Sequence, residues 1–290
     1  MKPRAGLEPA TCGLQENQDQ VSLEDYHKYL EVELQLSKRT IYQRVRIAKE
    51  FIKHVGNPYL VTREQVRDYL LEIKRTKTIS TYRNYLASLR HLFKYIGREY
   101  VIDGFRYPTR SYVPKRCPTK DELRTFYEAL DDMKERALFL VACSSGLRRK
   151  ELLSLTLDDI DLETGLIIPK PNHGSKTKHT FLTFCNNEAL EVLKQYLKTR
   201  SYKGKKLFPY SKGTDSYIFH KAQRKTGLRI TLKVCRLWFN VEMAKKGVPS
   251  HYIDAFCGRV PQGVIARHYA DYNIEVMEQV YRKANLKVLD

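Results

Sequence analysis

Residues 136–152 read RALFLVACSSGLRRKEL, and this stretch decides the fold of the second half of the chain. Its first ten residues are almost all apolar, which predicts a helix that is buried on all sides. Gly146 breaks that helix, and Arg148 opens the next one directly beside the core. A guanidinium held there stays charged and presents a planar fork that suits phosphate oxygens. Glu151, one turn away, could fix this fork; the alternative is a purely structural Arg148–Glu151 pair.

The segments on either side of this stretch are predicted to be mostly helical. Upstream, Thr119 is a suitable N-cap for a helix with an acidic first turn, which the helix dipole favours. Downstream, residues 166–168 and 180–184 read as two short strands around a turn rich in Gly and Lys, and residues 186–290 read mostly as helix. The predicted fold is therefore mainly α with a small antiparallel β-sheet.

The first half of the chain is predicted to form a separate helical module. Ser37, Thr62 and Ser80 precede apolar residues at helical spacing and mark the starts of three of its four helices. Gln65 follows Thr62 by three residues, as in a capping box. We expect a flexible leader at 1–20, a helical domain at 21–97, a linker rich in Gly and Pro at 98–117, and a second domain at 118–290.

The chain is strongly basic, with 52 Lys and Arg against 33 Asp and Glu and a net charge of +19. Residues 51–100 hold ten basic and four acidic side chains, and residues 201–250 hold twelve and two. Two separate basic regions suggest two surfaces that grip one long polyanion, and nucleic acid fits this description. For the charge alone, the alternative is a solvated face that aids solubility. The outer faces of the first module are predicted to carry eight DNA-contacting residues: Lys38, Arg39, Arg44, Arg46, Lys77, Arg83, Arg90 and Lys94.

Other features of the composition exclude several classes of protein. No apolar run reaches the roughly 18–20 residues of a membrane-spanning helix, and the N-terminus lacks a signal-peptide core. The six cysteines include no C-x-x-C pair, which argues against a zinc ribbon and for free thiols in a reducing compartment. The acidic run at 158–161 is the only candidate metal cluster and is interpreted as part of a turn. We therefore expect a cytoplasmic protein with no membrane segment, metal or cofactor.

Further cations follow along the chain. Lys176 and Lys178 lie in the turn between the two predicted strands, although lysines in such turns are usually only solubilising. Lys233 and Arg236 are three positions apart, so they share a helical face and can act on one anion.

One tyrosine completes a pattern with these cations. Arg259 follows Cys257-Gly258, and Tyr269 comes ten residues later. A phenol can attack a phosphodiester and keep the bond energy in a covalent link to the protein. The negative charge that develops on phosphorus requires positioned donors, which the arginines and Lys233 could supply without a divalent metal. The pattern therefore indicates phosphoryl-transfer chemistry.

The order and spacing of these residues closely resemble the tyrosine recombinases, the family of phage integrases, Cre and the Xer proteins. Ser145-Gly146-Leu147-Arg148, with Glu151 and Leu152, is similar to the box that carries the first catalytic arginine of that family. The resemblance implies a helical, SAM-like core-binding domain followed by a catalytic domain. The segment Ser175-Lys176-Thr177 is similar to the family's hairpin, which implies that Lys176 is the general acid for the leaving 5′ oxygen. Lys178 is the reserve assignment.

Two departures from the family pattern narrow the resemblance. The usual His-x-x-Arg box is Lys233-x-x-Arg236 in this sequence, and Arg259 stands where the family has His or Trp. That combination resembles the integrases of archaeal spindle-shaped viruses and their plasmid relatives. Because a lysine is normally protonated near neutral pH, we interpret Lys233 as an electrostatic stabiliser and not as a base.

Two further assignments come with alternatives. Tyr272 lies three residues beyond Tyr269, but the spacing from Arg259 and the preceding Arg267-His268 favour Tyr269 as the nucleophile. The family resemblance suggests that the final helix, with Ile274, Met277, Val280 and Tyr281 on one face, packs onto a neighbouring protomer; the alternative is packing within the chain.

The leader carries a separate hypothesis. Gly6-Leu7-Glu8-Pro9 can be encoded by a tract that looks like the T-arm of a tRNA gene. Archaeal integrases of the viral type carry their attachment site inside the integrase gene, where it matches a tRNA gene. The leader is therefore interpreted as translated attachment site, which the encoding DNA would test.

The sequence thus predicts an integrase of a mobile element that cuts and rejoins double-stranded DNA at attachment sites through a 3′-phosphotyrosyl intermediate. The resemblance implies a homotetramer on DNA, and we expect a monomer when the protein is free. The alternatives are a DNA-binding regulator that has lost the chemistry and a metal-dependent nuclease.

Overall fold

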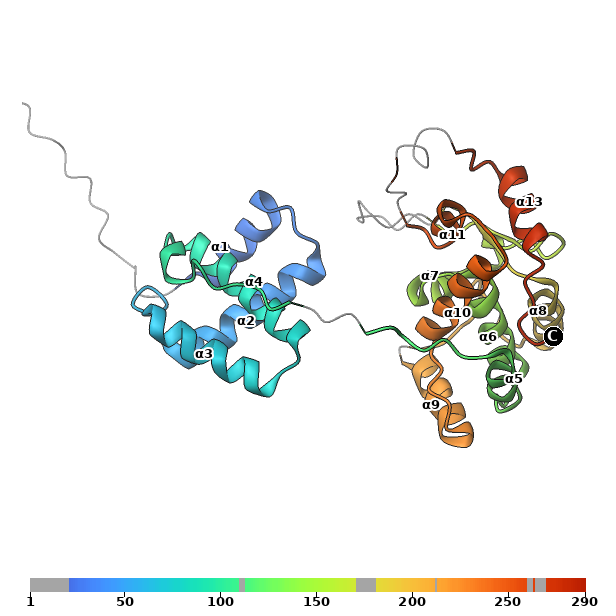
Figure 1. Cartoon of the computed structure of the whole chain (residues 1–290), viewed down its shortest axis with the longest axis horizontal. Helices are drawn as coiled ribbons and strands as arrows, with labels where there is room; N and C mark the ends of the chain where they lie inside the picture. The colour runs from blue at the N-terminus through green and yellow to red at the C-terminus, as the bar shows by residue number, and fades with distance from the viewer. Residues whose placement is uncertain (1–20, 110–112, 171–180, 212, 260–262, 264–269) are drawn as a thin grey trace, which may run out of the picture. The chain divides into compact units, whose positions relative to one another are not determined.

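A computed structural model describes residues 21–109, 113–170, 181–211, 213–259, 263 and 270–290. The chain divides into two compact units between Val113 and Pro114 (Figure 1). Each unit has its own core of buried hydrophobic side chains. No helix in the described ranges combines the length and the apolar character that crossing a bilayer requires.

The first unit is a bundle of four helices. They are α1 (Leu23–Lys28, continued by a π-helical turn, Tyr29–Glu33), α2 (Lys38–Val55), α3 (Arg63–Thr76) and α4 (Ile79–Tyr95). The predicted caps are confirmed at Ser37, whose side chain accepts from the backbone of Thr40, and at Thr62, which forms a capping box with Gln65. Helix α4 is capped by Thr78 instead of Ser80, because the Thr78 hydroxyl already accepts from the Thr81 backbone N–H at 3.3 Å.

Part of the segment that was expected to be a linker packs onto this first unit. A 3₁₀ turn covers Glu99–Val101, and Val101 and Ile102 are buried in the core of the bundle. The ring of Tyr107 lies against the guanidinium groups of both Arg83 and Arg90, at 4.9 and 4.6 Å. The first unit therefore extends well beyond residue 97.

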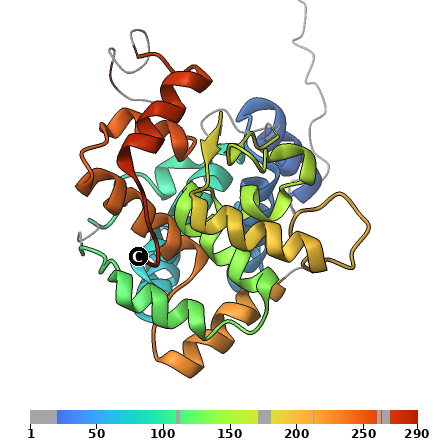
Figure 2. The ribbon, with the colours of Figure 1, turned by 90° about the vertical axis from the view of Figure 1, so that its right-hand side faces the viewer.

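The second unit is built around α6 (Met133–Ser145), which is buried from Ala137 to Ser145 as the sequence predicts. Figure 2 shows this unit facing the viewer, with its last helix, α13, in red. Its other helices within the described residues are α5 (Lys120–Glu128), α7 (Arg149–Ser154), α8 (Asn187–Thr199), α9 (Thr214–Thr226), α10 (Leu232–Lys245), α11 (Ser250–Phe256) and α13 (Ile274–Ala284), with a 3₁₀ turn at Leu157–Asp159. Helices α8 and α10 pack against α6.

The small sheet of this unit pairs β1 (Leu166–Ile167) with β2 (Thr183–Phe184) in antiparallel register, Leu166 opposite Phe184. The prediction of a mainly α fold with a small antiparallel sheet is therefore confirmed. The acidic run has the expected turn role: Asp159 accepts from the Thr156 backbone at 2.7 Å, and Asp161 accepts from the Glu163 backbone at 2.9 Å.

The final helix, α13, packs within its own chain in this structure. Met277 and Tyr281 are buried in the core of the second unit, and the Tyr281 hydroxyl donates to the carbonyl of Ser144 at 2.8 Å. Ile274, on the same predicted face, is 44% exposed. These contacts lie within one chain, and packing of this face on a neighbouring protomer stays a prediction.

Candidate active site

The site begins where α6 ends. Gly146 has φ +65°, a left-handed conformation that ends the helix and turns the chain toward α7. A Cβ at this position would lie 2.5 Å from Cδ1 of Phe239 and 3.1 Å from Sγ of Cys257. Only glycine therefore allows α10 to pack this closely against the turn. Leu147 is buried, and Arg148 then becomes the N-cap of α7.

Arg148 is held both by its backbone N–H and by its guanidinium. Its backbone N–H donates to Oε2 of Glu151 and its Nη1 donates to Oε1 of the same carboxylate, both at 2.8 Å. Its Nη2 donates to the carbonyl of Gly258, also at 2.8 Å. The Glu151 side chain is only 6% exposed, so the expected contact between the two residues is present and well sheltered.

Arg236 comes from α10, and its guanidinium binds backbone carbonyls close to the one that holds Arg148. Its Nη1 donates to the carbonyl of Gly146 at 2.6 Å, and its Nη2 donates to the carbonyl of Cys257 at 2.7 Å. Burial lowers the pKa of Arg236 from its ordinary value, and the positive charges of Arg148 and Arg259 lower it further. Arginine remains charged despite such shifts, so the three guanidinium groups form a concentrated positive field.

Arg259 follows α11 and is more exposed. Its Nη1 donates to Oδ1 of Asp254 at 2.6 Å, and its side chain is 47% exposed. Lys233 lies in the first turn of α10 and is exposed. Within the described part of the chain, its ammonium has no hydrogen-bond or ion-pair partner.

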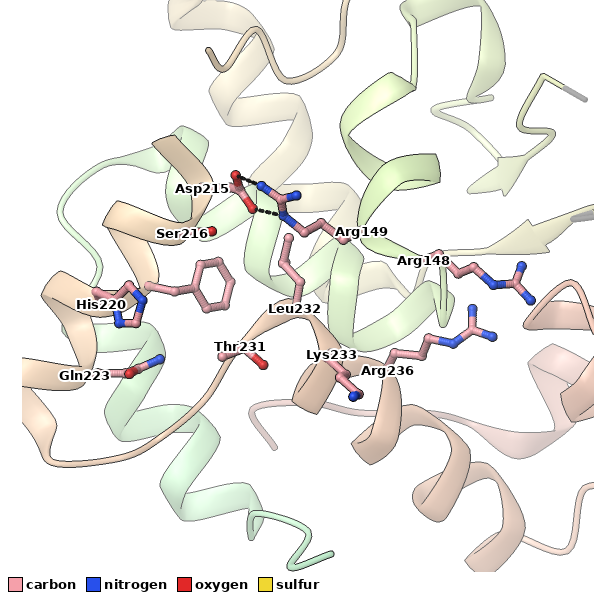
Figure 3. A pocket seen from close by; sticks show the side chains of 11 residues that line it. Arg148, Arg149, Asp215, Ser216, His220, Gln223, Thr231, Leu232, Lys233 and Arg236 are labelled. Carbon is pink, nitrogen blue, oxygen red and sulfur yellow. Dashed lines mark hydrogen bonds and ion pairs between the residues drawn. The ribbon is translucent and has the colours of Figure 1, made fainter. Parts of the chain in front are cut away.

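A cavity of about 470 Å³ lies beside three of these cations (Figure 3). Arg148, Lys233 and Arg236 all line it. Figure 3 shows the side chains of Arg148 and Arg236 extending side by side, whereas Arg149 turns the other way toward Asp215. The structure thus brings four of the predicted site residues together. Arg259 is the fourth, because its positive charge is close enough to lower the pKa of Arg236.

Sequence reasoning missed the pair formed by Arg149 and Asp215. Nε and Nη2 of Arg149 donate to the two carboxylate oxygens of Asp215 at 2.5 and 2.6 Å, and the Asp215 side chain is only 3% exposed. The pair ties the start of α7, next to Arg148, to the first turn of α9. Its two members are 66 residues apart, and the one available signal is the second arginine in the Arg148-Arg149 doublet.

We expect Asp215→Asn to lower the free energy of unfolding by about 2 kcal/mol, because the neutral amide cannot accept both guanidinium hydrogen bonds in a buried setting. Denaturation with urea measures the change. Asp158→Asn is the matched control, since its ion pair with Lys205 is exposed on both sides and should contribute less than about 1 kcal/mol. Equal stability of Asp215→Asn and the parent protein would contradict the prediction.

Three predicted site residues lie outside the described residues: Lys176, its reserve Lys178, and Tyr269. Tyr272, the competing tyrosine, is described. Its ring packs against Tyr252 and His251 of α11, with centroids 5.9 and 6.4 Å away. Burial raises the pKa of Tyr272, and the neighbouring Tyr252 and Asp254 raise it further.

The eight basic residues predicted on the outer faces of the first unit fall into two groups. Lys38, Arg39, Lys77 and Lys94 are exposed, and Arg46 is exposed but pairs with Glu50. The other three, Arg44, Arg83 and Arg90, are half-buried and donate to backbone carbonyls, and DNA contact stays a prediction for all eight. Arg44 also donates to Oγ of Ser88 at 2.8 Å, so it joins α2 to α4.

A family model described as the phage integrase family matches residues 117–275, more than half of the chain. The chain belongs to the phage integrase family. The predicted membership is therefore confirmed, whereas the narrower likeness to integrases of archaeal spindle-shaped viruses stays a prediction. The matched range contains every predicted catalytic residue, including the three that lie outside the described part.

Individual relatives agree with this assignment. This phage integrase family protein is 26% identical over 283 residues to tyrosine recombinase XerA of Thermococcus onnurineus, covering 91% of this chain and 95% of the relative. It is 24% identical over 249 residues to XerA of Pyrococcus horikoshii, covering 81% and 84%. A crystal structure of a lambda integrase dimer bound to a core site has the same fold, with a TM-score of 0.66, 17% identity, and coverage of 87% of this chain and 97% of that one.

Proposed function

We propose that this protein is a site-specific DNA recombinase that cuts and rejoins strands through a 3′-phosphotyrosyl intermediate on Tyr269. In the cleavage step, the hydroxyl of Tyr269 loses its proton to solvent, its oxygen bonds to the scissile phosphorus, and the bond from phosphorus to the 5′ oxygen breaks. Lys176 protonates the departing 5′ oxygen, with Lys178 as the reserve. The reverse step, by a 5′ hydroxyl of another strand, rejoins the DNA and frees Tyr269.

One observation carries the proposal. Arg148 and Arg236 bind the carbonyls of two consecutive residues, Gly258 and Cys257, and contacts with described residues use only some of the N–H donors of each guanidinium. A guanidinium has five N–H donors, and each of these two makes two hydrogen bonds to described residues. Three donors of each are therefore unused by the described residues, and we assign them to phosphate oxygens. Because both groups are held before DNA arrives, they can stabilise the charge that develops on phosphorus without reorganising.

The other two cations suit supporting roles. Lys233 lines the same cavity as the two arginines and is exposed, so its ammonium can add positive charge without being a base. Arg259 is half-exposed and directly follows the turn that holds both arginines. We assign both residues to the anion-binding cradle around the scissile phosphate.

The test is a nicked suicide substrate, in which cleavage releases a short fragment and traps the covalent complex. We expect a protein–DNA adduct that resists denaturation and forms equally well in excess EDTA. Strand cleavage that requires a divalent metal and leaves no adduct would favour the nuclease alternative. Tight, specific binding of the attachment-site DNA without any adduct would favour the regulator that has lost the chemistry. Either result would overturn the proposal.

The oligomeric state, the cellular location and the attachment site are also part of the proposal. A lambda integrase tetramer bound to a Holliday junction has the same fold as this chain, with a TM-score of 0.67, 17% identity, and coverage of 88% of this chain and 79% of that one. We propose a homotetramer on two double-stranded DNA sites, inside the cytoplasm of a host that carries the mobile element. An attachment site within a tRNA gene is part of this proposal, and a tRNA-like tract in the DNA that encodes Gly6–Pro9 would support it.

A further inference from the structure

Both site arginines are held by carbonyls of two consecutive residues. Nη2 of Arg236 donates to the carbonyl of Cys257, and Nη2 of Arg148 donates to the carbonyl of Gly258. We call these two residues the 257–258 turn. Because a guanidinium is planar and rigid, a small rotation of this turn would redirect both forks at once. Whatever holds the turn therefore sets the position of both arginines.

The backbone of α11 holds one side of the 257–258 turn. The N–H of Cys257 donates to the carbonyl of Ile253 at 3.0 Å, and the N–H of Gly258 donates to that of Ala255 at 2.8 Å. Gly258 has φ +59°, so the chain reverses direction there. These contacts fix the turn relative to α11 but not relative to α10, which carries Arg236.

A side-chain contact between Asn240 and Cys257 provides the link to α10. Nδ2 of Asn240 lies 3.3 Å from Sγ of Cys257, and Oδ1 of the same amide lies 3.6 Å from that sulfur. Nδ2 also donates to the backbone carbonyl of Arg236 at 2.6 Å, one helical turn earlier. The Asn240 amide therefore contacts both Arg236 and the 257–258 turn, whose carbonyls bind the two guanidinium groups.

The thiol fits this position closely. Cys257 is fully buried, and a Cβ at Gly146 would approach its sulfur to 3.1 Å. Gly146 provides the other carbonyl that binds Arg236. Burial raises the pKa of the Cys257 thiol, so it keeps its proton near neutral pH and can donate to the Asn240 amide as well as accept from it.

We propose that Asn240 and Cys257 are positioning residues for strand cleavage. Their amide–thiol contact holds the 257–258 turn against α10, and the two carbonyls of that turn orient both guanidinium groups toward the scissile phosphate. This inference rests on the proposed function. It assigns to the two residues a role that acts through Arg148 and Arg236.

The first test compares two substitutions of the thiol by their rate of adduct formation on the suicide substrate, with protein in excess so that all DNA is bound. We expect Cys257→Ala to slow cleavage about ten- to a hundredfold, because small displacements of catalytic groups have effects of this size. Cys257→Ser keeps a donor and an acceptor, so its rate should stay within about threefold of the parent. Affinity for DNA should hardly change in either variant.

The second test asks whether Asn240 acts through Arg236. Asn240→Leu keeps the branched shape and removes the amide, and it should slow cleavage to the same extent as Cys257→Ala. In an Arg236→Lys background the Arg236 fork is already lost, so adding Asn240→Leu should slow cleavage by a smaller factor than it does in the parent, through Arg148 alone. Asn240→Ser, too short to reach the thiol, replaces Asn240→Leu if that variant does not fold.

Cys185→Ala is the matched control, because Cys185 is buried in the same unit and contacts neither arginine in the described structure. Rates are measured well below the midpoint of thermal unfolding of every variant. Equal rates for Cys257→Ala and the parent would overturn the inference, as would equal losses in Cys257→Ala and Cys257→Ser, or additive losses with Arg236→Lys. If the parent protein itself forms no adduct, the proposed function fails instead, so the two failures are distinguishable.

Discussion

Replacing Tyr269 with phenylalanine is expected to abolish the covalent adduct on a suicide substrate completely. Phenylalanine retains the ring and removes the only nucleophilic atom, so no slower version of the same reaction remains. The affinity for DNA should be nearly unchanged, because the phosphate is held by the arginines and not by the phenol. Denaturing gel electrophoresis measures the adduct, and a mobility shift measures the binding.

Tyr272→Phe is the matched control for this prediction. The Tyr272 ring is held in an aromatic cluster with Tyr252 and His251, and phenylalanine keeps that packing. We expect adduct formation within about twofold of the parent, as for substitutions that leave packing intact. An adduct that persists in Tyr269→Phe and disappears in Tyr272→Phe would move the nucleophile to Tyr272 and refute our assignment.

The sequence predicts local features of this fold well, because their physical causes are local. Ser37 and Thr62 cap helices by accepting hydrogen bonds from backbone N–H groups only three residues later in the sequence. The buried helix before Gly146 is similarly visible as an apolar run that ends in glycine. The predicted start at Ser80 is wrong because Thr78, two residues earlier, is also a good cap residue and its hydroxyl accepts from the Thr81 backbone N–H.

The sequence could not reveal contacts that depend on how helices meet. Arg44 looks like an outer-face residue on α2, yet it reaches Asn84 and Ser88 on α4. The Arg149–Asp215 pair, and the carbonyls that hold Arg148 and Arg236, likewise join residues that are far apart in the chain. Motif spacing therefore predicted which cations belong to the site, whereas the structure shows the contacts that hold three of them, Arg148, Arg236 and Arg259.

Gly146→Ala is the second substitution for which we expect a large effect, on both stability and activity. A non-glycine residue in the left-handed region costs about 1–2 kcal/mol, and forcing atoms into a packed core costs about 1–3 kcal/mol more. The new Cβ would lie 2.5 Å from Phe239, whose ring is fully buried and cannot move aside freely. We therefore expect a loss of about 2–5 kcal/mol in the free energy of unfolding, measured by urea denaturation.

Gly227→Ala separates the two contributions. Gly227 has φ +72°, close to that of Gly146, but nothing lies within 4 Å of a Cβ placed there. It should therefore lose only the conformational part, about 1–2 kcal/mol, and keep its cleavage rate. Gly146→Ala should also slow adduct formation in the folded protein, because the Gly146 carbonyl holds Arg236 and the displaced Phe239 lies on the same helix. If the two alanine variants lose equal stability and cleave equally fast, the close packing of α10 on this turn does not position Arg236.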